Sequence, residues 1–526
     1  RISVTLKRTS DYALWYVDDA AYNALSPEQR SAYDANLSTL IKEFDLTIWP
    51  RSVSLWGGLV GASVDTTGKV SIVLQDLNES SGGYFETVHN YPARLAPTSN
   101  ERRMVFLNSD GVLTGQAKMF LAHEFQHLLS FEQKERAQQT EEDIWLNEVR
   151  SEYNITALGY SDPFVGSSLQ RRMKSFVRTP SDSLTVWPNT ATDYAVAAMF
   201  GHYVADRFGS LILADALKSP VTGANSLDVV LRRQGASFAE VFNDWMVASY
   251  LNDATVGQAY QYTRPELREI VISPRVLDPL QGGSLYRLDA MLSEWQPLWV
   301  QARVARLGSP AQYVSVGISN APIGVAGKII SRYQNGSTTV TGFSGVGTTK
   351  IPAVFGTAGL DSVTVAVAHG SLESVDARFI VPQSVRIVVS PGDIPAEALT
   401  TPLATQPTQT PSLVAWQDGD LVWVEGETYQ VFGAYRRLIV PAVRASAYNG
   451  RNPVSLLPSD VARYQVSNYV RALGDTKVYA VWPDGTKHWM DITAKQWEDS
   501  GRDWRAIFDI SSQEVAQYPT GPSITR

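Results

Sequence analysis

The chain has 526 residues, of which 44% are hydrophobic and 19% charged, and its net charge is −8 at pH 7. This length exceeds what one hydrophobic core can organise, so we expect two to four ordinary folded domains. The acidic balance argues against nucleic acid as a partner, the absence of cysteine excludes disulfides and thiolate-bound metals, and no apolar run is long enough to span a membrane.

Strands and helices alternate over residues 1–262, which predicts a mixed α/β (α+β) domain. Two segments, Asp11–Ala20 and Lys69–Leu77, have the alternation and the β-branched residues of strands, and Arg102–Ser109 is predicted to be a further strand. Between the first two, Ser26 is a predicted N-cap and Pro27 occupies the first helical position. Residues 191–252 are predicted to be helical, with Gly209 as a C-cap and a capping box formed by Ser237 and Glu240.

The segment LAHEFQHLLSF (Leu121–Phe131) places two of the six histidines of the chain four residues apart on a predicted helix. Residues at this spacing lie on one helix face, so His123 and His127 can bind the same ion. Imidazole suits zinc, and a catalytic zinc takes three protein ligands and leaves one position for water. Glu124 follows the first histidine directly and can accept a proton from that water.

A second predicted helix, within WLNEVRSEY (Trp145–Tyr153), supplies the third ligand. Glu148 is the predicted ligand. Glu152 lies one turn further on the same face, where it can accept a ring N–H from a ligating histidine. Each stretch alone also fits a solvated helix face, but their combination, at a spacing that a helix–loop–helix can satisfy, predicts one zinc ion per chain.

The helical period disappears after residue 262. Short β-rich segments broken by Gly, Asn and Pro predict an all-β sandwich over residues 263–390. Residues 391–414 are rich in Thr, Pro and Gln, which predicts an extended linker with little packing.

Residues 415–526 are predicted to form a small duplicated β-rich module. Tyr429–Val440 aligns with Tyr479–Met490, and Ser459–Tyr464 matches Gln513–Tyr518. These repeats resemble those at the C-termini of some bacterial surface proteins, which implies attachment to a cell-wall polymer, a glycan or a surface protein. Alternatively, their aromatic side chains only fill small β cores.

Several motifs follow one another in the order of a known family: GGYF (Gly82–Phe85), LAHEFQHLLSF, WLNEVRSEY and DYAVAAMFGHYVADRFG (Asp193–Gly209). With them, residues 10–252 are similar to the gluzincin metallopeptidases and, more closely, to the hyicolysin family of bacterial neutral metallopeptidases. This resemblance implies a zincin-like catalytic domain with a helical lower half. It also implies peptide-bond hydrolysis by zinc-bound water that Glu124 deprotonates.

The resemblance also implies further site residues. Tyr194 opens a predicted helix and matches the tyrosine that stabilises the oxyanion in aminopeptidase-like gluzincins, although it can equally pack on the core. His202 is either a second group of the site or a structural histidine. The zincin fold implies an edge strand that pairs with extended substrate; Gly83 and Tyr84 are the candidates, whereas we expect His89 nearby to be a surface or structural residue. The chain lacks the G-x-M-E-N stretch that anchors a substrate amino terminus, which favours cleavage within a chain.

The sequence therefore predicts a zinc metalloendopeptidase that acts on proteins or peptides. The composition favours an extracellular or bacterial cell-surface location. The alternative is a surface adhesin or structural protein whose peptidase-like domain cleaves nothing. The presence of all three ligands together with Glu124 favours the enzyme.

Overall fold

The computed structural model describes residues 2–77, 82–277, 280–281, 285–306, 312–372, 382–400, 421–424, 427–432, 435–448, 454–455, 464–473, 475–482, 485–500 and 502–525. The chain divides into two compact units, Arg1–Thr401 and Pro402–Arg526. Within the described ranges, every helix is either too short or too polar to cross a membrane.

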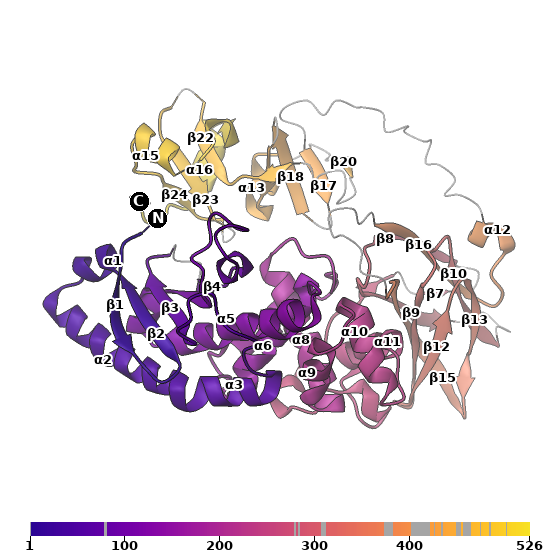
Figure 1. Cartoon of the computed structure of the whole chain (residues 1–526). Helices are drawn as coiled ribbons and strands as arrows, with labels where there is room; N and C mark the ends of the chain where they lie inside the picture. The colour runs from indigo at the N-terminus through magenta and orange to yellow at the C-terminus, as the bar shows by residue number, and fades with distance from the viewer. Residues whose placement is uncertain are drawn as a thin grey trace. The chain divides into compact units, whose positions relative to one another are not determined.

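The first unit opens with a mixed sheet of strand order β1-β2-β3-β5-β4 (Figure 1). Its strands are β1 (Val4–Thr9), β2 (Ala13–Asp18), β3 (Val70–Gln75), β4 (Gly83–Tyr84) and β5 (Met104–Asn108). The central strands β2, β3 and β5 are parallel, whereas β1 and β4 pair antiparallel at the two edges. Parallel strands need two covered faces, and the apolar sequences of β3 and β5 are buried almost throughout.

Helices from the first half of the chain cover one face of this sheet. They are α1 (Asp19–Ala24), α2 (Pro27–Glu43), α3 (Trp49–Trp56), α4 (Asp110–Thr114) and α5 (Ala117–Phe131). Side chains such as Trp15, Ile72 and Leu107 point from the sheet into a core shared with Phe125 of α5. The predicted N-cap is confirmed, because the Ser26 hydroxyl accepts a hydrogen bond from the backbone N–H of Gln29.

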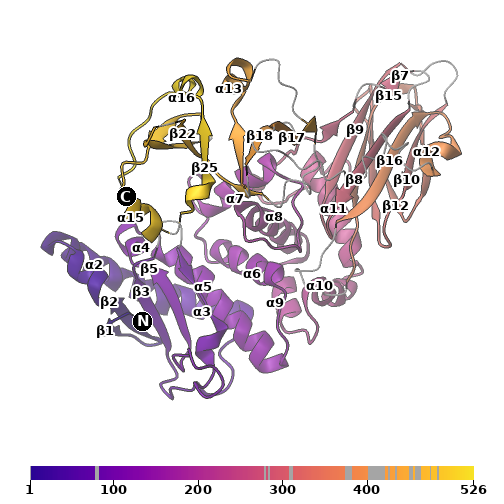
Figure 2. The same ribbon diagram turned by 90° about the horizontal axis from the view of Figure 1, so that it is seen from above.

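The helical half comprises α6 (Ile144–Ala157), α7 (Ser168–Arg178), α8 (Ala191–Phe208), α9 (Leu211–Leu217), α10 (Gly223–Arg232) and α11 (Phe238–Leu251). Helix α6 contacts α5 and α8, and α7 also contacts α8 (Figure 2). The predicted capping box of Ser237 and Glu240 at α11 is confirmed, and α8 ends at Gly209 as predicted.

Two sheets follow the helices and enclose a core rich in Val and Ile side chains; their strands pair antiparallel except for β6 and β7, which pair parallel with β9. One sheet has the order β13-β10-β16-β8 and the other β12-β11-β15-β9-β6. The strands are β6 (Arg275–Val276), β7 (Leu280–Gln281), β8 (Tyr286–Leu292), β9 (Leu298–Arg306), β10 (Tyr313–Ser319), β11 (Ala326–Tyr333), β12 (Thr338–Ser344), β13 (Gly347–Pro352), β14 (Val354–Phe355), β15 (Ala358–Ala368) and β16 (Gln383–Pro391).

These β-sheets share a core with the helical half. The ring of Trp295 packs edge-on against Phe238 and Phe242 of α11, and Trp299 Nε1 donates to the carbonyl of Met246 at 2.9 Å. Such packing explains why residues on both sides of position 262 fall within one compact unit.

The start of the predicted linker is more ordered than its composition indicates. Residues Ala396–Thr400 form a short helix, α12, and the Leu399 carbonyl accepts hydrogen bonds from Ser319 and Arg386 of the sandwich. The remainder of the predicted linker, residues 401–414, lies outside the described residues.

The second unit contains two small sheets with matching topology. In one, β17 (Leu421–Val424), β18 (Glu427–Phe432) and β19 (Tyr435–Ile439) run antiparallel, and β20 (Val454–Ser455) pairs parallel with β17. In the other, β22 (Tyr469–Ala472), β23 (Val478–Val481) and β24 (Lys487–Trp489) run antiparallel, and β25 (Ile507–Ile510) pairs parallel with β22. The first sheet also carries β21 (Gln465–Val466), parallel to β19.

Positions that the predicted repeat alignment pairs have similar surroundings. Val431 and Val481 are buried, whereas Phe432 and Trp482 are exposed. Short helices α13 (Pro441–Ser446), α15 (Ala494–Asp499) and α16 (Ser512–Gln517) accompany the sheets. Of the second predicted match, residues 459–463 lie outside the described residues.

Candidate metal centre

The three predicted metal ligands meet between α5 and α6. His123 Nε2 lies 3.1 Å from His127 Nε2 and 3.2 Å from Glu148 Oε2, and His127 Nε2 lies 3.5 Å from Glu148 Oε1. The histidines share a face of α5 because they are four residues apart, and the packing of α6 on α5 brings Glu148 to that face. One ligand atom from each side chain therefore lies within 4.8 Å of the others.

Ser151 fixes the tautomer of His127. Its hydroxyl donates to Gln126 Oε1 at 2.6 Å and also lies 3.1 Å from His127 Nδ1. A serine hydroxyl has one proton, so His127 Nδ1–H must be the donor in the second contact. The lone pair of His127 is then on Nε2, the atom that faces His123 and Glu148. Sequence analysis missed this role of Ser151, which lies one turn beyond Glu148 on α6.

The separations between these atoms suit zinc. Ligand atoms bound tetrahedrally at about 2.0–2.1 Å lie about 3.3–3.4 Å from one another. Glu148 Oε2 is buried and, although it approaches His123, makes no hydrogen bond of good geometry. A buried carboxylate oxygen of this kind needs a cation or a donor. The donor set of two imidazoles and one carboxylate is the one that catalytic zinc sites use.

The charge of the surrounding cavity also favours a divalent cation. The cavity has a volume of about 650 Å³, and three carboxylates line it, those of Glu124, Glu148 and Glu152. Arg172 is a half-buried cation in the same wall, while Arg171 lines the cavity but is exposed to solvent. With both histidines neutral and the three carboxylates ionised, the Arg172 guanidinium leaves two negative charges, which a divalent cation neutralises.

The same charges shift the pKa values of the site. Burial raises the pKa of Glu124 to about 7, and Glu148 and Glu152 act in the same direction. Burial opposes a charge on His123, but Glu148, Glu124 and Glu152 outweigh it and raise the His123 pKa to about 9. Burial dominates at His127 and lowers its pKa. Since a metal binds neutral imidazole, we expect metal binding to release a proton from His123.

Edge strand β4 passes close to Glu124. Gly83, Tyr84 and Phe85 line the cavity together with the Glu124 side chain. A Cβ atom at Gly83 would lie 2.6 Å from the Phe106 carbonyl oxygen and 2.9 Å from Glu124 Cγ, so only glycine permits this approach. The residues predicted to pair with substrate, Gly83 and Tyr84, thus form the edge of the sheet beside the metal cluster.

Glu152 lies beside the metal cluster, but its hydrogen bonds go elsewhere. Its Oε1 is 3.8 Å from His123 Nδ1, which is too long for the predicted hydrogen bond. Both carboxylate oxygens instead accept from Arg172, at 2.7 Å and 3.1 Å. The sequence did not reveal this competing partner.

Tyr194 lies in the first turn of α8 and lines the same cavity. Its hydroxyl donates to Asn189 Oδ1 at 2.9 Å, and its ring lies edge-on to Trp187. Burial raises the pKa of Tyr194, and Glu148 raises it further. The phenol therefore remains protonated at neutral pH, and it can donate to another acceptor only by giving up its hydrogen bond to Asn189.

The other histidines considered lie away from this cavity. His202 is buried, with Nδ1 2.7 Å from the Ala198 carbonyl and Nε2 2.9 Å from Thr156 Oγ1. His89 is also buried and lies 3.3 Å from Glu86. Neither histidine lines the cavity, so the contacts of both are those of structural residues.

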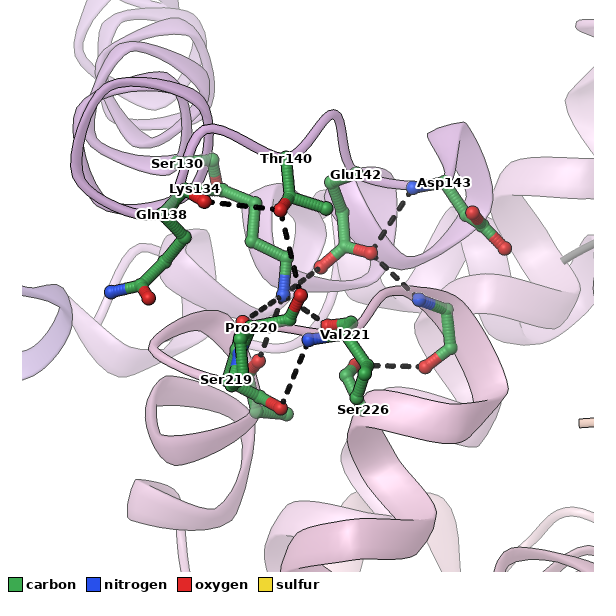
Figure 3. A network of polar contacts seen from close by, with 12 residues as sticks. Ser130, Lys134, Gln138, Thr140, Glu142, Asp143, Ser219, Pro220, Val221 and Ser226 are labelled. Carbon is green, nitrogen blue, oxygen red and sulfur yellow. Dashed lines mark hydrogen bonds and ion pairs between the residues drawn. The ribbon is translucent and has the colours of Figure 1, made fainter. Parts of the chain in front are cut away.

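A buried ionic network anchors the segment between α5 and α6 (Figure 3). Lys134 lies in the π-helical turn η3 (Glu132–Arg136) that extends α5, and its Nζ donates to the carbonyls of Ser219 and Val221. Glu142, just before α6, lies 3.6 Å from Lys134 Nζ and 2.8 Å from Arg150 Nη1. The network ties the two ligand-bearing helices to the loop between α9 and α10.

A histidine pair and a glutamate on adjacent helices, with a buried glutamate beside them, define a metallopeptidase-like site. No protein-family model matches the chain. Neutral metalloprotease ShpI of Staphylococcus hyicus is 24% identical over 251 residues, which amount to 42% of this chain and 55% of ShpI. This similarity supports a metallopeptidase-like relationship. The chain spans little more than half of the length of ShpI.

Proposed function

We propose that the chain is a zinc-dependent metalloendopeptidase of the gluzincin type, similar to hyicolysin. The observation that carries this proposal is the convergence of His123, His127 and Glu148 beside the buried carboxylate of Glu124. The relationship to a neutral metalloprotease supports it independently. His123 and His127 would hold zinc through Nε2, and Glu148 through its carboxylate.

The proposed mechanism assigns one role to each side chain. Bound zinc supplies a Lewis acid that acidifies water and polarises a carbonyl. Glu124 accepts a proton from the attacking water and then delivers it to the leaving amine. Tyr194 donates its hydroxyl proton as a hydrogen bond to the oxyanion, a role that its place in the wall of the same cavity supports.

The shape of the cleft supports cleavage within a chain. A second cavity, of about 220 Å³, shares Phe85, His127 and Glu148 with the first. The two cavities therefore adjoin at the ligand cluster. An extended peptide that pairs with β4 by strand addition can pass the cluster in both directions, as an endopeptidase requires.

We also propose that the protein acts outside the cell or at the cell surface. Residues 415–526 would then attach it to a cell-wall polymer, a glycan or a surface protein. Exposed aromatic side chains of the second unit support such binding: Trp423, Phe432, Trp482 and Trp504.

The proposal is tested by metal analysis of the purified protein together with cleavage of casein, an unstructured substrate. We expect one zinc per chain, cleavage that a chelator stops and added zinc restores, and a thermal unfolding midpoint that rises with zinc. A ligand at one hundred times its Kd stabilises the folded state by about 2.7 kcal/mol. Zinc without cleavage would favour the non-cleaving adhesin, and failure to take up zinc would overturn the site.

Tyr194→Phe tests the proposed oxyanion donor. Loss of one such donor is expected to lower kcat by about 10²–10³-fold, with zinc content and KM little changed. Casein-derived peptides give both constants, and Tyr12→Phe, far along the chain and partly exposed, is the control. Full activity of Tyr194→Phe would exclude the hydroxyl from the reaction.

A further inference from the structure

Arg172 contacts two residues of the proposed active site, Glu152 beside the metal cluster and Tyr194 in the cavity wall. It lies on α7, a helix to which sequence analysis assigned no function, and its side chain is 25% exposed. Its Nε and Nη2 donate to the two oxygens of Glu152, at 3.1 Å and 2.7 Å. Its Cζ lies 4.6 Å from the centre of the Tyr194 ring.

The first contact fixes the carboxylate beside a metal ligand. A guanidinium that binds both oxygens of a carboxylate sets its plane as well as its position. Glu152 Oε1 lies 3.8 Å from His123 Nδ1, so a small shift would bring it within hydrogen-bonding distance of the ring or move it away. Arg172 therefore controls how closely Glu152 approaches the imidazole that binds zinc.

The second contact bears on the oxyanion donor. The Tyr194 ring has two neighbours, the Arg172 guanidinium over the ring and the edge-on ring of Trp187. Its hydroxyl is held by Asn189, a residue with φ of +64° immediately before the N-cap of α8. Stacking by a planar cation restricts the ring, so Arg172 helps to set where the hydroxyl points.

We propose that Arg172 is a positioning residue that holds Glu152 beside His123 and the Tyr194 ring at the wall of the cavity. This inference rests on the proposed peptidase function. The contacts of Arg172 in this wall are with Glu152 and Tyr194, and through them it acts on the ligand cluster. It is also the half-buried cation among the three carboxylates that line the cavity.

Replacement by methionine separates positioning from a general contribution to folding. In Arg172→Met we expect kcat for peptide cleavage to fall by about 10–100-fold, with KM little changed. Zinc affinity, measured by competition with a chromophoric chelator, is expected to stay at or above that of the wild type. The reason is that the variant removes a positive charge near the cation site. A merely structural role would instead weaken zinc binding.

Two further variants sharpen the test. Arg172→Lys keeps the charge but cannot bind both carboxylate oxygens or stack flat on the ring, so we expect it to remain slow. Because Arg172 acts partly through Glu152, the Glu152→Gln/Arg172→Met double variant is expected to lose less than the sum of the single losses. Arg178→Met, an exposed arginine at the end of α7, is the matched control with wild-type activity.

The inference is overturned if Arg172→Met cleaves as fast as the wild type, if Arg172→Lys is fully active, or if zinc affinity falls together with kcat. In each case the wild type still cleaves and binds zinc, so the proposed function stands. A wild type that takes up zinc and cleaves nothing overturns both. The Arg172 variants therefore test the positioning role, and the wild-type assay tests the proposed peptidase function.

Discussion

Glu124→Gln is expected to retain one zinc per chain and to lose casein cleavage, with kcat lower by about 10²–10⁴-fold. Glutamine has the shape of glutamate but cannot accept a proton from the attacking water or return it to the leaving amine. Glu124 is not one of the three clustered ligands, so the metal should remain. The side chain is buried between α5 and β4, where a residue of equal volume preserves the packing.

The measurement is zinc content and initial cleavage rate for the wild type and the variant, purified in the same way. Glu269→Gln, an exposed glutamate outside the cavity, controls for the substitution itself and should behave as the wild type. Undiminished cleavage by Glu124→Gln would require another base. Loss of zinc from the variant would mean that Glu124 belongs to the ligand set.

Local periodicity explains why the metal cluster could be predicted from the sequence. Two histidines four residues apart share a helix face whatever surrounds the helix, and Glu148 needed only a second helix within a short connection. The caps at Ser26 and Ser237 are predictable for the same reason, because each depends on residues within one turn.

Contacts between distant segments could not be predicted in this way. The distance from Glu152 to His123 depends on Arg172, which comes from a helix whose position only tertiary packing decides. Helix α7 does carry a visible pattern, with Leu169, Met173 and Phe176 buried at helical spacing. That pattern predicts the helix but not which residue its arginines meet.

The predicted domain boundary at residue 262 also depends on contacts between distant segments, which the sequence does not reveal. Composition changes after residue 262 from helical to β-rich, which suggested separate domains. Trp295 and Trp299 nevertheless pack on α11 and belong to the core of the helical half, while the sandwich also encloses a core of its own. The sequence around Trp295 and Trp299 does not indicate that these side chains pack against a helix and not within the sandwich.

Glu142→Gln is expected to lower the free energy of unfolding of the first unit by about 3–5 kcal/mol. The Glu142 side chain is 4% exposed and lies between two buried cations, Lys134 and Arg150. Its Oε1 also accepts the backbone N–H groups of Asp143 and Gly223. Removing the Glu142 charge leaves the buried side chains of Lys134 and Arg150 without their strongest attractive partner, and Asp143 acts on both more weakly.

The position of this network determines which measured properties should change when Glu142→Gln lowers the stability. It joins the extension of α5 and the start of α6 to the loop between α9 and α10, as Figure 3 shows for Lys134 and Glu142. Weakening it should therefore loosen the packing that brings Glu148 to the histidines. We expect zinc affinity to fall together with the thermal unfolding midpoint, unlike in Arg172→Met, where only kcat falls.

Thermal and urea unfolding of wild type and variant, each with and without zinc, provide the measurement. Asp215→Asn is the control, because Asp215 is an exposed acid on α9 close in sequence to the same loop, and surface changes usually stay within about 0.5 kcal/mol. A second variant, Lys134→Met/Glu142→Gln, removes one of the stranded cations and should regain part of the loss. If Glu142→Gln unfolds like the control, the buried cations must be satisfied by their carbonyl partners alone. The link between this network and the metal cluster would then fail.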